Sequence, residues 1–318
     1  MATPIHKVKA RVDADGALDH KALFLLIHQE GETILLDEAR RVLLMAHPRV
    51  DVSRFDAMAK DILDLFSGKF PGYRACNTLY HDLAHTLETL LAMVRLCHGA
   101  ALAGNDLPPR DLLLGAAAAL MHDTGYIQKT SDKEGTGAKY TVEHVPLSAD
   151  FAGWYLKTHG FGEKDAARVR SMILCTDLAM EIADIPFPDS RAELLGKMLA
   201  SVDLLGQMAS RIYLEKLLYL YQEFTEGKTG GFSSERDLLE KTRGFFGYME
   251  ERLGGSLGGV YRYMPRHFSA AFGVDVDPYY QYAQKNLEYL VSLLNGGYDH
   301  REELKRRGIF ADIERREE

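Results

Sequence analysis

Histidine and aspartate recur in three short segments of the chain, in combinations that suit a metal ion. The first segment, LYHDLAHTLET, contains His81 and His85, which are four residues apart (85 − 81). The second, LMHDTGY, ends a very apolar stretch with His122 and Asp123, and the third, LASVDLLGQMA, contains Asp203 as a lone acid. Imidazole and carboxylate groups are ligands for hard-to-borderline divalent ions, and a metal removes the penalty of burying them unpaired. The three segments together therefore predict a metal site.

Each segment alone has a plainer interpretation. Two histidines four residues apart share one face of a helix, but they are more often two partly exposed side chains. The His-Asp dipeptide occurs twice, at 81–82 and 122–123. Asp203 alone could be a buried acid paired with an arginine. The conjunction favours the metal site, because HxxxH precedes an apolar helix ending in His-Asp-x-Gly and a further aspartate follows in an apolar segment.

Helical periodicity of apolar residues runs through nearly every long segment, and strand alternation is rare. This pattern predicts an all-α protein whose metal ligands lie on separate helices. Ser53 is expected to cap the helix over 53–66. The polar, Gly-containing segment 128–139 predicts a mobile loop whose lysines could reach a phosphate. The predicted helices span 19–47 with a break at Gly31, 53–66, 77–98, 110–124, 143–158, 163–182, 190–226, 234–252 and 278–294.

Composition and charge narrow the class of protein. The chain has 318 residues, of which 46% are hydrophobic, which is ample for a sizeable core. The net charge of -8 argues against general nucleic-acid binding, which usually needs a basic surplus, but it allows a small phosphorylated substrate. We expect a helical N-terminal segment at 1–70 packed on a catalytic domain at 71–298, followed by a charged tail at 299–318.

The cysteines and the apolar runs indicate a cytoplasmic protein. Cys76, Cys97 and Cys175 form no CxxC pair and no disulfide framework, which fits a reducing compartment. The N-terminus has no apolar run of the signal-peptide type. The most apolar stretch, LLLGAAAALM at 112–121, is too short to cross a bilayer, which needs about 20 residues. No membrane association is therefore expected.

The three segments together resemble the HD superfamily of metal-dependent phosphohydrolases. YHDLAHT is similar to the YHNxxHA segment of class I cyclic nucleotide phosphodiesterases, with Asp82 where those enzymes have Asn. The interval of 37 residues from His85 to His122 (122 − 85) and the segment ILCTDLAMEI are also similar to theirs. DLLGQMASRIY resembles a segment of the HD-GYP group, but Tyr126 stands where that group has lysine. The match to the phosphodiesterases covers roughly residues 75–215.

The resemblance implies an HD-domain helical bundle with additional N- and C-terminal helices. It makes His85, His122, Asp123 and Asp203 the metal ligands, and Asp123 could bridge to a second ion. His81 takes the place of the general acid, and Asp82 or another carboxylate could hold it cationic. His144 is a further candidate ligand for a second ion, and its alternative is a solvent-facing histidine at a helix start.

The expected function is hydrolysis of a phosphoester, with a cyclic nucleotide or another nucleotide as the first candidate substrate. One or two divalent ions are expected, and Mn, Mg, Zn, Fe and Ni are not distinguished. A homodimer is one option for the assembly. Two alternatives stay open. An HD-fold di-iron oxygenase would need more histidine ligands than the basic set, and a nucleotide-sensing module would usually have lost some ligands.

Overall fold

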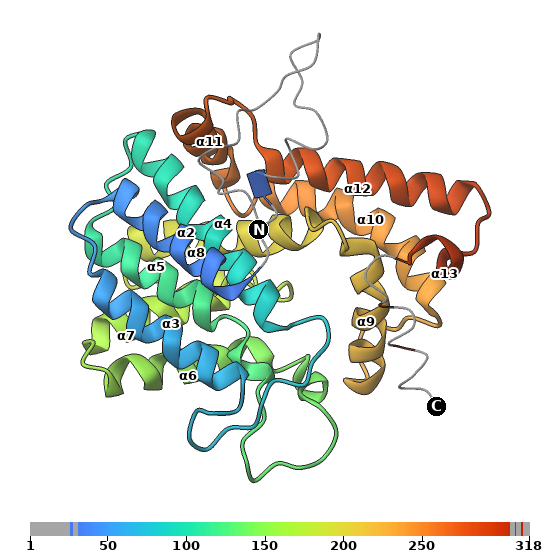
Figure 1. Ribbon diagram of the computed structural model, residues 1–318, viewed down its shortest axis with the longest axis horizontal. Helices are drawn as coiled ribbons and strands as arrows, with labels where there is room; N and C mark the ends of the chain where they lie inside the picture. Colours follow the sequence, from blue (N-terminus) through green and yellow to red (C-terminus); the bar gives the residue numbers. More distant parts are fainter. Residues whose placement is uncertain (1–25, 28–30, 306–308, 310–312, 314–318) are drawn as a thin grey trace.

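The computed structural model describes residues 26–27, 31–305, 309 and 313, and the regular secondary structure of these residues is helical (Figure 1). Their one strand-like pairing is an isolated bridge between Tyr73 and Lys129. The prediction of an all-α fold is confirmed. Short 3₁₀ helices lie at η2 Thr124–Tyr126, η3 Gly137–Tyr140, η4 Ile182–Asp184 and η5 Val260–Tyr263. The α-helices are α2 Glu32–Ala46, α3 Val52–Phe66, α4 Leu83–Leu102, α5 Pro109–Met121, α6 His144–Thr158, α7 Glu163–Leu174, α8 Ser190–Met208, α9 Tyr213–Glu226, α10 Glu235–Gly254, α11 Met264–Phe272, α12 Pro278–Asn295 and α13 His300–Glu303.

Helix α5 lies at the centre because its sequence has no polar face. Every residue of α5 from Asp111 to Met121 is buried. Gly115 and the four alanines that follow it keep the helix narrow, so that neighbouring helices approach closely. A Cβ atom at Gly115 would lie 3.1 Å from the Met93 side chain of α4 and 3.3 Å from Leu195 of α8. The core that holds the candidate ligands is therefore built from α4, α5 and α8.

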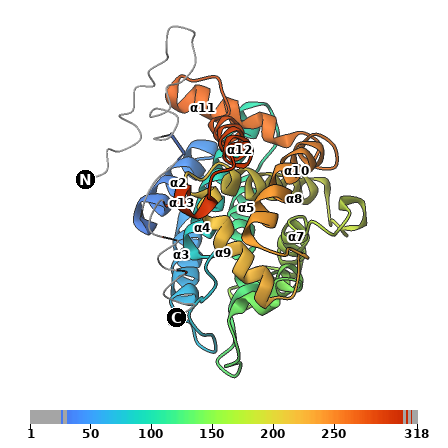
Figure 2. The same ribbon diagram turned by 90° about the vertical axis from the view of Figure 1, so that its right-hand side faces the viewer.

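The remaining helices surround this core in two groups. Helices α2, α3, α6 and α7 lie on one side of the molecule in Figure 1, and α9, α10 and α12 lie on the other. Turning the molecule shows α11 and α12 together near its top (Figure 2). The predicted boundary at residue 70 falls just after α3, and α2 and α3 pack against α4 and α5. The division into three parts stays a prediction.

Several predicted helix boundaries were wrong, for local reasons. Helix α3 is capped by Asp51, whose carboxylate accepts a hydrogen bond from the Arg54 backbone N–H, and Ser53 lies inside the helix. The helix predicted over 110–124 ends at Met121, and the one predicted over 163–182 ends at Leu174. The single helix predicted over 190–226 is α8 followed by α9. The first part of the predicted 19–47 helix lies mostly outside the described residues.

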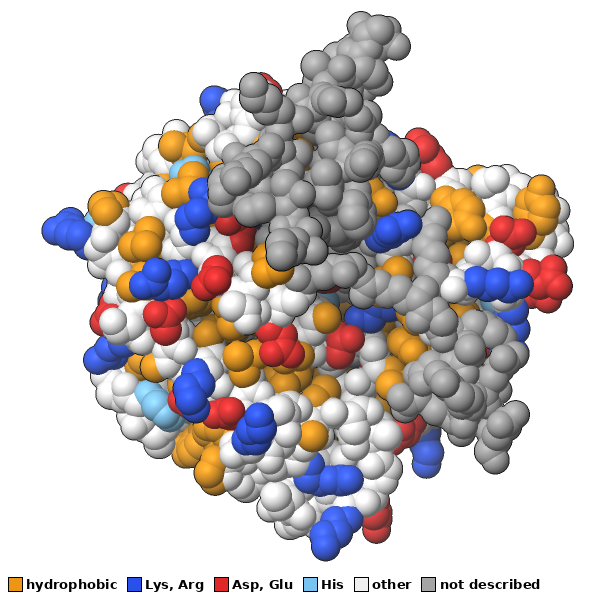
Figure 3. Space-filling model, viewed as in Figure 1, with side chains coloured by type: hydrophobic (Ala, Val, Ile, Leu, Met, Phe, Trp, Pro, Cys, Tyr) orange, Lys and Arg blue, Asp and Glu red, His pale blue; other side chains and the backbone are white. Residues whose placement is uncertain are grey.

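The face of the molecule seen in Figure 3 carries lysine and arginine side chains interspersed with aspartate and glutamate. Among the described residues, no helix combines the length and the apolar composition needed to span a membrane.

A buried histidine pair joins α4 to α11. The Nδ1 atoms of His98 and His267 lie 2.9 Å apart, so one ring donates and the other must accept in its neutral form. His267 is fully buried. Burial lowers the pKa of His267 well below 6.5, and the nearby cations Arg95 and Arg41 together with His98 lower it further. Burial and Arg41 lower the pKa of His98 in the same direction.

This pair predicts a loss of stability in acid. The folded-state pKa of His267 lies below its unfolded value of about 6.5, so the neutral ring stabilises the fold above that pH and the stabilisation falls below it. Between pH 7.5 and 5.5 we expect His267 to account for a loss of about 1 kcal/mol in the free energy of unfolding. The free energy of unfolding is measured with urea at both pH values. Between them, the His267→Asn protein should lose less of this free energy than the wild type, by the same amount. An equal loss in the two proteins would contradict the assignment.

Candidate metal centre

Three helices bring the predicted ligands together. His85 lies in the first turn of α4, whose N-cap is Asp82. His122 is the C-cap of α5, with Asp123 next to it, because the helix ends there. Asp203 lies inside α8. The start of α4, the end of α5 and the middle of α8 thus meet at one point. Packing of the three helices brings together ligands that lie far apart in the sequence.

The ligand atoms lie at the spacing that one metal ion requires. The Nε2 atom of His85 is 3.3 Å from Oδ2 of Asp123 and 3.1 Å from Oδ1 of Asp203. The Nε2 atom of His122 is 3.3 Å and 3.5 Å from the same two oxygens. The two Nε2 atoms are 3.3 Å apart. Ligands about 2.1 Å from one ion lie about 3.0–3.5 Å from each other, so the observed spacing fits a shared coordination sphere.

Orphaned polar atoms point to the same conclusion. Oδ2 of Asp123 and Oδ1 of Asp203 are buried and have no hydrogen-bond partner among the described residues. The Nδ1–H group of His122 donates to the Ala119 carbonyl oxygen at 2.8 Å, which leaves Nε2 with a free lone pair. Burial of unpaired carboxylate oxygens is costly unless a cation compensates it.

The pKa shifts in the cluster show that its two carboxylates favour positive charge beside them. Burial disfavours the charged form of His85, but the carboxylates of Asp123 and Asp203 outweigh it and raise its pKa from 6.5 to about 9. Burial would raise the pKa of both aspartates, yet His122 and His85 lower it instead. Protons on the imidazoles or a divalent ion can supply this charge.

The buried group of His85, His122 and Asp203 could hold a metal ion, with one ligand atom from each residue and all three atoms within 4.8 Å of one another. Asp123 adds an oxygen 3.3 Å from each of the two imidazoles. The predicted ligands are therefore brought together. The alternative for Asp203, a pairing with arginine, is wrong, because its nearest charged neighbours are imidazoles.

His144 approaches the other oxygen of Asp123. Its Nδ1–H group donates to the Thr141 carbonyl oxygen at 2.7 Å, and its Nε2 atom lies 3.8 Å from Oδ1 of Asp123. Gly125 makes this approach possible, because a Cβ atom there would lie 2.1 Å from the His144 carbonyl oxygen. Burial lowers the pKa of His144, which favours the neutral form that a metal ligand needs.

His81 does not share a helical face with His85, so that prediction was wrong. Helix α4 begins only at Leu83, and His81 lies before it. Contacts with Glu223 of α9 hold the residues before Leu83 outside the helix. One oxygen of Glu223 accepts hydrogen bonds from the backbone N–H groups of Leu79 and Tyr80, at 2.7 and 2.6 Å. The side chain of Glu223 thus satisfies donors in the segment that was expected to be helical.

The same carboxylate orients His81. Oε2 of Glu223 lies 2.7 Å from Nδ1 of His81, which leaves Nε2 for the cavity. Burial would raise the pKa of Glu223, but His81 and the backbone N–H groups lower it. The carboxylate beside His81 is therefore Glu223 and not Asp82, because Asp82 caps α4 and lies 3.3 Å from Lys216.

Tyr126 packs against both of the histidines that flank the cluster, whose own ring centroids lie 5.9 Å apart. Its ring stacks on His81 at 4.4 Å and 14°, and on His144 at 4.4 Å and 22°. This is the position at which the HD-GYP group has lysine. The three stacked rings restrict how far His81 and His144 can turn. The sequence held no sign of this stack, because the three residues lie in different segments.

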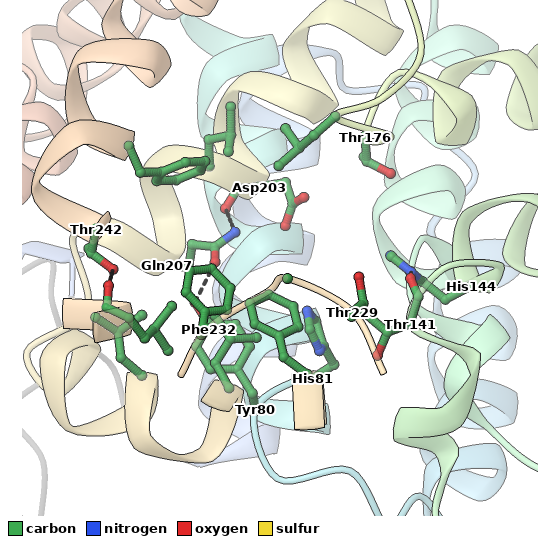
Figure 4. Close-up of a pocket in the computed structure, with 18 of the residues that line it drawn as sticks. Tyr80, His81, Thr141, His144, Thr176, Asp203, Gln207, Thr229, Phe232 and Thr242 are labelled. Carbon is green, nitrogen blue, oxygen red and sulfur yellow. Dashed lines mark hydrogen bonds between the residues drawn. The ribbon is translucent and has the colours of Figure 1, made fainter. Parts of the chain in front are cut away.

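A cavity of about 780 Å³ opens beside the cluster. His81, Tyr126, His144 and Asp203 line one end of it, and Figure 4 shows Asp203 and His144 facing the same space from different helices. Most of the remaining wall comes from the segment 176–179, from the loop at 229–232 and from α8, α9 and α10. The cluster thus adjoins a chamber large enough for a small organic ligand.

The predicted lysine loop contributes nothing to this wall among the described residues, and neither does the chain segment 261–282, which is rich in aromatic residues. Lys139 contacts Asp132 at 2.6 Å and the Glu134 carbonyl oxygen at 2.7 Å, so it is bound within its own loop. The aromatic segment instead packs at η5, α11 and α12, for example through Phe268.

No protein-family model matches the sequence, and no curated protein is significantly similar to it. Membership of the HD superfamily therefore stays a prediction that rests on the three segments.

Proposed function

We propose that the protein is a metal-dependent phosphohydrolase that cleaves a phosphoester in the cavity beside the cluster. One observation carries the proposal. The ligand set of His85, His122, Asp123 and Asp203 reaches, through Asp203, the end of the cavity that His81 also lines, and His81 is paired with a carboxylate. Metal ligands beside a positioned proton donor are the two parts that phosphoester hydrolysis needs.

A divalent ion in the cluster would polarise a phosphoryl oxygen and lower the pKa of a bound water toward neutrality. His85, His122, Asp123 and Asp203 would hold this ion, and Asp123 together with His144 would hold a second. His81, protonated, would donate from Nε2 to the leaving oxygen of the ester. Before this transfer, Glu223 would pair with the positive ring from the Nδ1 side and hold its orientation. Tyr126 would keep both histidine rings in place.

A metal-exchange assay tests this proposal. Protein stripped with a chelator is expected to hydrolyse neither nitrophenyl phosphodiesters nor monoesters, and one of Mn²⁺, Mg²⁺, Zn²⁺, Fe²⁺ or Ni²⁺ is expected to restore turnover of at least one of them. A divalent ion is needed because the cluster holds the ligands and the chain alone supplies no Lewis acid. Release of nitrophenolate is the measurement.

Two outcomes would contradict the proposal. Stripped protein that is fully active would show that the cluster is not used. Protein that binds each of the ions but hydrolyses no phosphoester would remove the phosphohydrolase assignment.

A further inference from the structure

The cavity beside the cluster is polar at one end and mainly apolar over the rest of its wall. The polar end carries His81, Tyr126, His144 and Asp203. Away from it, Leu217, Leu220 and Phe224 of α9 face residues of α10 and the loop before it. The ring of Phe224 stacks on that of Phe232 at 5.5 Å between centroids, so α9 and the loop before α10 form a continuous apolar surface.

The two charged side chains in the apolar part, Lys241 and Asp177, already have hydrogen-bond partners in the protein. Lys241 lies 3.0 Å from Oδ2 of Asp237 and 3.2 Å from the Gly231 carbonyl oxygen. Asp177 accepts a hydrogen bond from the Ala179 backbone N–H at 2.8 Å. Within the described wall, Lys241 is the one lysine and there is no arginine. A second phosphate group would therefore lack a free cation to bind it.

The amide in the wall is also engaged. Gln207 accepts a hydrogen bond from the Tyr80 hydroxyl, and its Nε2 atom donates to the Asp203 carbonyl oxygen at 3.0 Å. Both ends of this amide are thus held by the protein, and Figure 4 shows it on the side of the view away from His144. The Thr242 hydroxyl donates a hydrogen bond to the Leu238 carbonyl oxygen at 2.8 Å. Few groups remain to recognise the edge of a nucleobase.

We infer that the substrate carries a single phosphoryl group on a large apolar alcohol, such as an alkyl phosphate or an alkyl phosphodiester. This inference rests on the proposed function, because the phosphoryl group would lie at the metal cluster. The alkyl group would then extend along α9 and α10 and displace water from their apolar side chains. Hydrolysis would add water across the P–O bond, releasing the alcohol with the proton that His81 donates.

Binding affinity tests the inference without any need for turnover. The dissociation constants of methyl, butyl and octyl phosphate for the metal-loaded protein are measured by calorimetry. Each methylene that leaves water is expected to tighten binding by about threefold to fourfold. Octyl phosphate should also bind more tightly than adenosine monophosphate. Equal affinity for the three alkyl phosphates would overturn the inference, as would tighter binding of adenosine monophosphate.

Two matched leucine variants locate the alkyl group. Leu220 of α9 and Leu287 of α12 are both half-buried, but only Leu220 lines the cavity. Leu220→Gln is expected to reduce the gain from methyl to octyl phosphate at least tenfold, and Leu287→Gln to leave it unchanged. The same gain in both variants would place the alkyl group elsewhere and overturn the inference.

A parallel turnover assay separates this inference from the proposed function. Hydrolysis of methyl and octyl nitrophenyl phosphate is compared in the same preparation. Turnover without a chain-length effect on binding or rate would refute the apolar substrate while leaving the phosphohydrolase intact. Chain-length-dependent binding of the alkyl phosphates without turnover of any ester would support the apolar site and refute the hydrolase.

Discussion

Replacing Asp203 with alanine is expected to remove the metal from the protein and to abolish phosphoester hydrolysis. The carboxylate of Asp203 lies 3.1 Å from His85 and 3.5 Å from His122, so its loss takes away one side of the ligand set. The remaining imidazoles would then lack one of the two anions that offset the charge of a divalent ion. Elemental analysis of the purified protein and a nitrophenyl phosphate assay measure the two effects.

Asp177 provides the matched control for this variant. It is an aspartate that lines the same cavity, but its carboxylate accepts from the Ala179 N–H and lies outside the ligand set. Asp177→Ala is expected to keep the metal and most of the activity. A chelator should lower the thermal midpoint of the wild type and of Asp177→Ala, because a ligand that binds the folded state stabilises it. Full metal occupancy in Asp203→Ala would place the site elsewhere.

Three of the candidate ligands are marked locally in the sequence, and the resemblance to the phosphodiesterases singled out His85 from His81 as the fourth. His122 and Asp123 follow a stretch so apolar that only a central helix could hold it, and that helix ends where they stand. Asp203 is an acid in an otherwise apolar helical segment. Such signals depend on neighbours along the chain, which periodicity reports well.

The position of His81 could not be predicted in the same way. Helical periodicity carries the pattern of α4 back to residue 77. Asp82 caps the helix at its true start, and Glu223 holds the segment before it away from a helical path. That carboxylate is 142 residues further along the chain (223 − 81). A tertiary hydrogen bond of this kind overrides local propensity, and no sequence window contains both partners.

The wall of the cavity was missed for a related reason. The apolar residues of α9 that line it, such as Leu217 and Leu220, follow the same spacing as residues that face a core. One sequence cannot distinguish a helix face that packs against a neighbour from one that lines a chamber. The break between α8 and α9 decides which occurs, because α9 takes a new direction after Met208 (Figure 1).

The His81→Ala protein is expected to keep its metal and to lose activity by about 10²–10⁴-fold, the usual contribution of a positioned general acid. The metal should stay because the described ligand atoms come from His85, His122, Asp123 and Asp203, none of which is altered. The loss should depend on the leaving group. Nitrophenolate departs without a proton, so nitrophenyl esters should be spared relative to alkyl esters.

Glu223→Gln tests the pairing that orients His81. Glutamine keeps an oxygen for the Leu79 and Tyr80 N–H groups, so the segment before α4 should remain in place. The substitution removes the negative charge that lies 2.7 Å from Nδ1 of His81. A hydrogen bond to a charged group contributes about 1.5–3 kcal/mol, so the hydrolysis rate is expected to fall about 10–100-fold. Glu226→Gln is the matched control, because Glu226 lies on the same helix and binds Thr136 instead.

The two variants together separate proton donation from metal binding. If His81 donates the proton, then Glu223→Gln should show the same preference for nitrophenyl over alkyl esters as His81→Ala, in weaker form, and Glu226→Gln should show none. Both variants should retain full metal content by elemental analysis. If the purified His81→Ala protein contains no metal, or if it loses the same factor of activity on both kinds of ester, His81 would be a metal ligand and not the acid. The acid would then have to be sought among the other groups at that end of the cavity, of which Tyr126 stacks directly on His81.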